Sequence, residues 1–105
     1  MTGAAASLPA DARILELRPE ALLFETRVCL LPGTLLSFTL VMEGQPLALQ
    51  APVDALLVAD RDRTGYVFNC RIALATLPAA DQHIILLFIG KGRGSPGLVP
   101  TEASK

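Results

Sequence analysis

Few side chains in this sequence are of the types that perform acid–base, nucleophilic or metal chemistry. The single histidine, His83, has no serine or cysteine at the spacing of a known nucleophile motif. A metal site needs three or four nitrogen, sulfur or oxygen ligands, whereas Cys29 and Cys70 are far apart and lie within apolar runs. We therefore expect no catalytic residue, no metal and no cofactor, and we interpret both cysteines as reduced side chains packed as small hydrophobes.

Two charged segments imitate functional motifs. Residues 60–63 alternate aspartate with arginine, a charge pattern that is more typical of a self-neutralising loop than of an acid–base pair. Residues 90–94 read Gly-Lys-Gly-Arg-Gly, but a phosphate-binding loop requires a strand before it and the start of a helix after it. Because Pro96 and Pro100 follow instead, we interpret this segment as a flexible linker. The protein is therefore not expected to be an enzyme.

Composition limits the remaining function classes. The chain has 105 residues, enough for one domain, and 51% of them are hydrophobic. Nine basic and ten acidic residues leave a net charge of −1, so there is no basic field to attract nucleic acid. The N-terminus lacks the pattern of a signal peptide, and the longest apolar run, at 84–89, is too short to span a bilayer. The sequence predicts a cytoplasmic protein that does not insert into membranes.

Hydrophobic periodicity divides the chain into a flexible leader at 1–12, a folded body at 13–89 and a disordered tail at 90–105. Within the body, apolar alternation and turn-forming Pro and Gly residues predict a series of strands. These strands span 13–17, 22–30, 34–42, 47–59 and 66–72, with a polar loop at 60–65. Because they follow one another through hairpin-length links, they predict an antiparallel sheet that is closed or nearly closed on itself.

The end of the body has a helical pattern. Thr76 and Pro78 are typical of a helix N-terminus, and Gly90 is typical of a helix end. A helix between them would place five apolar residues on one face, namely Leu77, Ala80, Ile84, Leu87 and Phe88. The same segment is also compatible with a buried strand at 84–89, because that run is apolar at every position.

An apolar run of this kind must be covered on more than one side. We therefore predict that the end of the helix contacts either a second copy of the chain or another protein. The predicted interface residues are Ile85, Leu86 and Ile89.

Assembled in order, the body resembles a PilZ domain, the small bacterial β-barrel of six strands with a C-terminal helix. The resemblance covers residues 14–89 and lies in the spacing of strands and turns. Its matching runs are Ile14–Thr26, Leu31–Leu40, a strand containing Val53, Thr64–Ile72 and the closing amphipathic helix. The resemblance implies a mainly β fold, a small antiparallel six-stranded PilZ-like barrel with a C-terminal helix.

PilZ domains that bind cyclic di-GMP carry an upstream R-x-x-x-R segment and a D/N-x-S-x-x-G turn. Arginines suit the two phosphates of that ligand, and a carboxylate or amide suits the guanine edges. Here Glu16 stands in the acidic position, but Arg18 replaces the serine, Ala21 replaces the glycine and Arg13 is the only arginine upstream. Each missing charge-assisted hydrogen bond is worth roughly 1.5–3 kcal/mol, so we expect binding by the usual mode to be lost.

Three hypotheses follow for the function. The first is a non-catalytic PilZ-like adaptor in regulation linked to cyclic di-GMP, pili or motility, whose partner is another signalling or motility protein or a second copy. The second is a cyclic di-GMP receptor with an altered site formed by Arg13, Glu16 and Arg18. The third is an unrelated small β-barrel that serves as a binding module. We favour the first, because the phosphate-binding arginines are missing and the last helix has surplus apolar surface.

Overall fold

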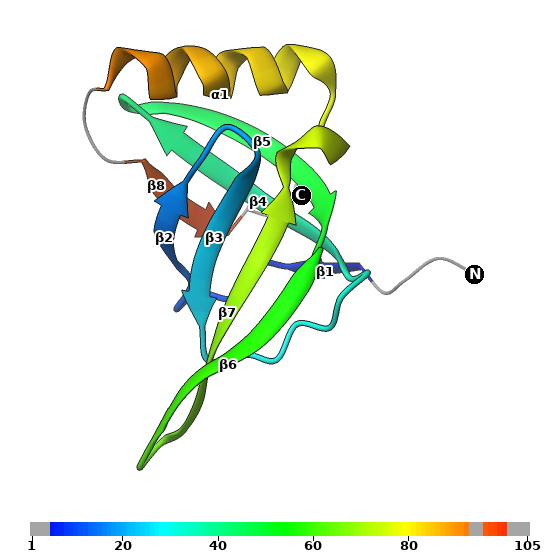
Figure 1. Cartoon of the computed structure of the whole chain (residues 1–105), viewed down its shortest axis with the longest axis vertical. Coiled ribbons are helices and arrows are strands. Elements are labelled where there is room, and N and C mark those ends of the chain that lie inside the picture. The colour runs from blue at the N-terminus through cyan, green and yellow to red at the C-terminus, as the bar shows by residue number, and fades with distance from the viewer. Residues whose placement is uncertain (1–4, 93–95, 101–105) are drawn as a thin grey trace, which may run out of the picture.

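Two four-stranded β-sheets and one C-terminal α-helix make up the protein (Figure 1). The computed structural model describes residues 5–92 and 96–100. Its elements are β1 (Ala5–Ser7), β2 (Arg13–Leu17), β3 (Ala21–Thr26), β4 (Leu35–Met42), β5 (Gln45–Pro52), β6 (Ala55–Asp62), β7 (Gly65–Ala73), the short 3-10 helix η1 (Leu74–Thr76), α1 (Ala79–Lys91) and β8 (Gly97–Pro100). The mainly β class and the C-terminal helix are as the sequence predicts.

The two sheets differ in how they are assembled. In the first, β4 pairs with β5 along one edge, while β1 and β8 share the other edge. The second sheet has the order β2-β3-β7-β6 and is antiparallel throughout. The sheets are not closed into a barrel, and the described residues form eight strands, so the prediction of a six-stranded barrel is wrong in both respects. The extra strands are β1 and β8, which come from the expected leader and tail.

The β4–β5 hairpin shows why local sequence forms regular strands here. Even-numbered residues of β4 are buried and odd-numbered ones are half-buried, as the alternation at 34–42 predicts. A two-residue loop joins the strands, and both of its residues, Glu43 and Gly44, have positive φ angles of 54° and 77°. This is the backbone of a type I′ turn, whose twist matches that of the strands it connects.

The chain passes from one sheet to the other at Val53 and Asp54. The Val53 N–H donates to the carbonyl of Thr34 in a 2.8 Å hydrogen bond, whereas the Asp54 N–H donates to the carbonyl of Arg71 on β7 at 2.7 Å. The prediction that residues 55–59 continue the preceding strand is therefore wrong, because they begin β6 in the second sheet. Most of the expected polar loop at 60–65 also belongs to strands β6 and β7.

Both chain ends contribute to the fold where they are described. Leu8 is buried, and its N–H donates to the Ser37 carbonyl at 3.0 Å. Asp11 accepts hydrogen bonds from the buried Thr26 hydroxyl at 2.7 Å and from the Arg27 N–H at 2.8 Å. At the other end β8 pairs with β4. These segments differ from the flexible leader and disordered tail expected from composition; residues 1–4, 93–95 and 101–105 lie outside the described residues.

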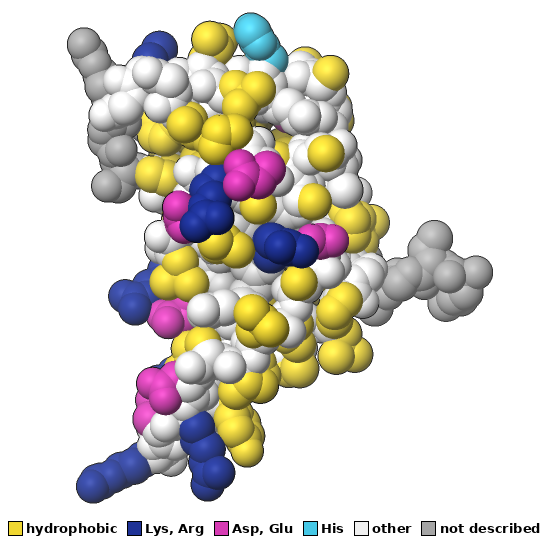
Figure 2. All heavy atoms as spheres, in the orientation of Figure 1, with side chains coloured by type: hydrophobic (Ala, Val, Ile, Leu, Met, Phe, Trp, Pro, Cys, Tyr) yellow, Lys and Arg dark blue, Asp and Glu magenta, His cyan; other side chains and the backbone are white. Residues whose placement is uncertain are grey.

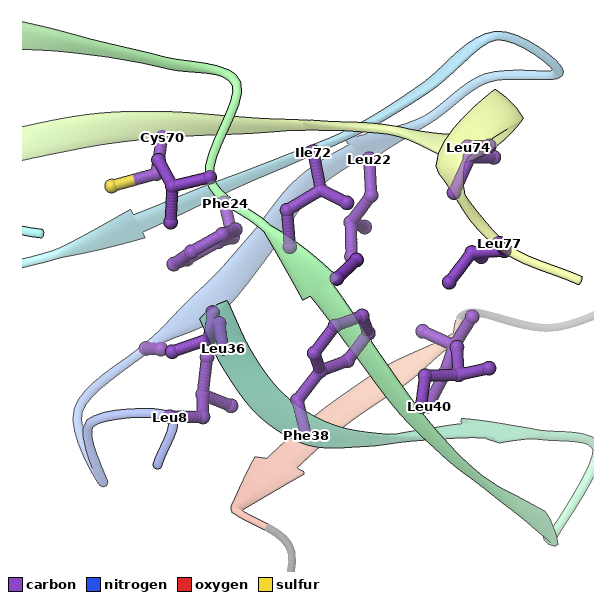
Figure 3. Close-up of a cluster of buried hydrophobic side chains, with 14 of the residues drawn as sticks. Leu8, Leu22, Phe24, Leu36, Phe38, Leu40, Cys70, Ile72, Leu74 and Leu77 are labelled. Atoms are coloured by element: carbon purple, nitrogen blue, oxygen red, sulfur yellow. The ribbon is translucent and has the colours of Figure 1, made fainter. Parts of the chain in front are cut away.

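Side chains from both sheets and from the helix region form one core (Figure 3). Phe24 on β3 and Phe38 on β4 come from different sheets, and both are fully buried. Cys70 also lies in this core, where burial and the nearby Cys29 raise the pKa of its thiol to about 11. Cys29 is exposed, unlike the packed side chain that we expected, because it lies in the loop after β3. Neither cysteine forms a disulfide.

The helix α1 covers one end of the sheets (Figure 1). Residues 84–89 are helical, so the strand alternative is wrong. Thr76 does not cap α1: it ends η1, and its hydroxyl donates to the Ala73 carbonyl at 2.6 Å. Gly90 lies within the helix, and Gly92, with a left-handed φ of 64°, ends it.

Candidate functional site

Of the predicted ligand residues, Arg13 and Glu16 lie on β2, an edge strand of the second sheet, and Arg18 directly follows its last residue. The guanidinium of Arg13 is 2.7 Å from Glu25, and that of Arg18 is 2.7 Å from Glu16. The hydrogen bond from Arg18 lowers the pKa of the Glu16 carboxyl, and the same bond raises the pKa of Arg18. The structure therefore brings Glu16 and Arg18 together and leaves Arg13 at the other end of the strand.

Each arginine of this set is already engaged by a carboxylate. Figure 2 shows basic and acidic side chains in adjoining pairs on this face, with hydrophobic side chains beside them. Arg13 and Arg18 are separated by a five-residue strand, about 16 Å at the usual rise per residue. They do not form a single cluster of positive charge. Exposed ion pairs of this kind contribute little to stability and can be displaced by a ligand.

A shallow cavity of about 220 Å³ opens on the outer face of the same sheet. Its walls are mainly aliphatic, and it is lined by Leu15, Leu23, Ala55, Leu57, Asn69, Cys70 and Arg71. The buried Oδ1 of Asn69 has no hydrogen-bond partner among the described residues. Arg71, at the edge, donates from Nε to Asp54 at 2.8 Å. The cavity thus combines an apolar lining with a buried amide oxygen that has no partner among the described residues.

The predicted interface on α1 is only partly accessible. Ile85 is fully buried and packs in the core with Phe88, so the prediction that Ile85 contacts a partner is not compatible with its position. Leu86 is 45% exposed, and Ile89 is half-buried. The core-facing side of the helix differs from the predicted one by one residue position. Ile84, which we expected on that side, is exposed, and the neighbouring Ile85 is buried there instead.

A second, larger groove lies between α1 and the β4–β5 hairpin; we call it the hairpin groove. Its volume is about 280 Å³, and it is lined by Met42, Glu43, Gln45, Pro46, Leu47, Ile84, Leu87, Phe88 and Lys91. Aliphatic and aromatic side chains make up most of this lining. At its rim, the Lys91 ammonium is 3.6 Å from the Glu43 carboxylate. The groove is therefore an apolar concavity with a charged edge.

Sequence reasoning missed the hairpin wall of this groove. The sequence places Leu47 at the start of a predicted strand and assigns Pro46 to no element, because their position beside α1 depends on tertiary packing. The signal that could have found them is the two-residue loop itself, because it fixes the register of Met42 opposite Gln45.

Other reactive side chains are scattered over the surface. His83 is exposed on α1. Asp62 accepts a bidentate pair from Arg27, at 2.6 and 3.1 Å, and further bonds from Thr64. The Arg27 guanidinium and the Thr64 hydrogen bonds hold the pKa of Asp62 well below its usual 3.8. Among the described residues, no three His, Cys, Asp or Glu side chains gather as metal ligands would.

The described helices are all too short or too polar to cross a lipid bilayer. No family model, no curated protein and no solved structure matches this chain. The geometry alone therefore describes what the site can do. Among the described residues it consists of two apolar concavities with charged side chains at their edges.

Proposed function

We propose that this chain is a non-catalytic PilZ-like adaptor that acts through protein–protein contact at the hairpin groove. The observation that supports it most is the groove itself. Leu87 is 54% exposed and Ile84 is 44% exposed, and both stand on the wall of an apolar concavity. Grooves of this kind beside a helix are typical of protein docking sites.

The state of the arginine set favours an adaptor over a nucleotide receptor. Arg13 lies at the start of β2 and Arg18 just after its end, and each contacts a carboxylate. A ligand with two phosphates would need arginines that converge on it. The sequence resemblance to PilZ domains is what suggests regulation linked to cyclic di-GMP, pili or motility, in the cytoplasm.

Site-specific photo-crosslinking in cells that express the chain naturally tests this function. A photoreactive residue replaces Leu87, and a matched one replaces Leu31. Leu31 is 63% exposed and lies in the β3–β4 loop, away from α1 (Figure 1). We expect one discrete crosslinked protein from position 87, identified by mass spectrometry of the joined peptides, and none from position 31. Absence of any crosslink at 87, or equal crosslinks at both positions, would contradict the proposal.

A second candidate, a cyclic di-GMP receptor with an altered site, is favoured by one observation. The cavity beside Leu15 is lined by Asn69, whose buried Oδ1 has no partner among the described residues and would accept a hydrogen bond from a base once the side chain rotates toward the cavity. Isothermal titration with cyclic di-GMP tests it. Saturable binding that Arg18→Ala and Arg13→Ala weaken would establish the receptor, whereas no heat at high protein concentration would exclude it and leave the adaptor.

A further inference from the structure

Four exposed residues of α1 form a stripe on the side of the helix that faces the hairpin groove. They are Ala80, Ile84, Leu87 and Lys91, and three of them line the groove. Their spacing of four, three and four residues keeps them on one helix face. The spacing is the same when it is read in either direction, so the stripe is symmetric about its midpoint between residues 85 and 86.

We propose that the occupant of the hairpin groove is α1 of a second copy, packed antiparallel across a two-fold axis. This inference rests on the proposed function, since it takes the same groove as the interface, and it names the partner. The axis passes near the midpoint of the stripe. It places Ile84 of one copy against Leu87 of the other, and Ala80 against the aliphatic stem of Lys91. A two-fold interface of this kind uses one self-complementary patch on both copies.

Charge order favours the antiparallel arrangement. Asp81 lies in the first turn of α1 and Lys91 in the last. Antiparallel packing places Lys91 of each copy at the end of the interface that carries Asp81 of the other, although Asp81 itself is half-buried and lies outside the groove lining. This packing also opposes the two helix dipoles. A parallel arrangement would set Asp81 beside Asp81 and Lys91 beside Lys91. The charges at the two helix ends therefore favour the antiparallel orientation over the parallel one.

The size of the groove fits this occupant. A cavity of about 150 Å³ holds a benzene-sized group. The hairpin groove, at about 280 Å³, has room for two aliphatic side chains, such as Ile84 and Leu87 of the second copy. A helix of 13 residues is about 20 Å long, and a stable interface needs about 800 Å² per partner, so the hairpin rim must share in the contact. We expect a dimer with a dissociation constant on the order of micromolar.

Sedimentation equilibrium of the full chain over a wide concentration range measures the dimer directly. We expect the mass to rise from 11.1 kDa toward twice that value. Leu87→Asp should weaken association at least about 100-fold, because it buries an unpaired carboxylate from each copy. The matched control is Leu86→Asp: Leu86 is 45% exposed but lies on the other flank of α1, so association should be unchanged. Circular dichroism verifies that both variants fold.

A charge-exchange experiment tests the antiparallel pairing itself. Asp81→Lys alone sets two lysines together at each end of the dimer, and Lys91→Asp alone sets two aspartates together. Each variant should dimerise about tenfold more weakly than the natural chain. In an equimolar mixture every lysine meets an aspartate, so the two variants should form a heterodimer of near-natural affinity. A mixture no stronger than its components would overturn the antiparallel register.

The outcomes separate this inference from the proposed function. A dimer that survives Leu87→Asp overturns the inference. A chain that stays monomeric, but whose position 87 crosslinks to a different protein in cells, overturns the second copy as occupant and leaves the adaptor function standing. A monomer with no crosslink at position 87 overturns both.

Discussion

The hairpin groove and strand β6 both expose aliphatic side chains, yet they are built in opposite ways. On α1, Ile84 and Leu87 are 44% and 54% exposed; on β6, Leu57 and Val58 are 68% and 62% exposed. In the groove these side chains face a second wall across a concavity. On β6, Leu57 lines the shallow cavity of the second sheet, and Val58 stands on an edge strand whose hairpin with β7 projects from the body (Figure 1).

Charge distinguishes the two surfaces further. Residues 60–63 at the end of β6 alternate aspartate with arginine. If two copies paired the charged end of β6 antiparallel, with the two-fold axis at residues 60–63, each residue would oppose one of the same parity. Aspartate would then meet aspartate, and arginine would meet arginine. Like charges directly opposite one another destabilise a sheet. The more exposed surface is thus protected against self-pairing, whereas the less exposed groove is complementary to itself. Exposed area alone does not identify an interface.

The largest expected difference is in the free energy of unfolding, between a variant in the core under α1 and a variant on the surface of β6. Ile85 anchors α1 and is fully buried, so Ile85→Ala should lower the free energy of unfolding by about 2–5 kcal/mol. Leu57→Ala on β6 removes a similar amount of side chain from an exposed site and should change it by less than about 0.5 kcal/mol. Urea unfolding of both variants measures this. Comparable losses would mean that β6 is covered in solution.

The next effect concerns two glycines at the end of α1. Gly92 has a left-handed φ of 64°, so Gly92→Ala should destabilise the protein by about 1 kcal/mol. Gly90 lies inside the helix, and an added Cβ there would meet nothing within 4 Å. Gly90→Ala should therefore stabilise by about 0.5–1 kcal/mol. Thermal unfolding of the pair gives the signs, and equal signs would contradict the assigned end of the helix.

Asp62, the last residue of β6, should make the free energy of unfolding depend on pH in the acid range. Because its pKa is lower in the folded chain than its usual 3.8, its contribution is present above pH 3.8 and is lost as the pH falls further. Asp62→Asn removes this contribution. The unfolding free energies of the natural chain and the variant should therefore differ at neutral pH and converge below pH 3.8. A constant difference across this range would show that Arg27 does not hold the carboxylate in solution.

The smallest effect is expected for an exposed side chain of β6. Val58→Thr replaces one methyl group by a hydroxyl on a side chain that is 62% exposed. It should change both the unfolding free energy and the dimer dissociation constant by less than about 0.5 kcal/mol. A clear loss of dimer in sedimentation would move the interface from the groove to β6.

Sequence patterns predicted the parts of this fold that depend on near neighbours. The alternation at 34–42, the turn after Leu31 and the helical segment at 84–89 are all local in origin. The turn closes with a 3.1 Å hydrogen bond from the Thr34 N–H to the Leu31 carbonyl, and Gly33 supplies its φ of 90°.

The parts that were missed depend on partners far away in the chain. Strands β1 and β8 lack any strong periodicity and form because β4 offers them an open edge. The face of α1 was misplaced by one residue, since an all-apolar run such as 84–89 carries no periodic signal to orient it. The hairpin groove could not be predicted from α1 or from the β4–β5 hairpin taken separately. It exists because the hairpin turn brings Pro46 and Leu47 beside Ile84 and Leu87.

Isotope-filtered nuclear Overhauser spectroscopy on an equimolar mixture of ¹³C-labelled and unlabelled chain tests the central claim most directly, since it reports contacts between copies only. We expect cross-peaks between the methyl groups of Ile84 and Leu87 that weaken on dilution, and that are weaker in Asp81→Lys, which keeps both methyl-bearing side chains but should dimerise about tenfold more weakly. Cross-peaks between copies at Leu57 and Val58 instead, or none at a concentration where the chain sediments as a dimer, would contradict the antiparallel α1 interface.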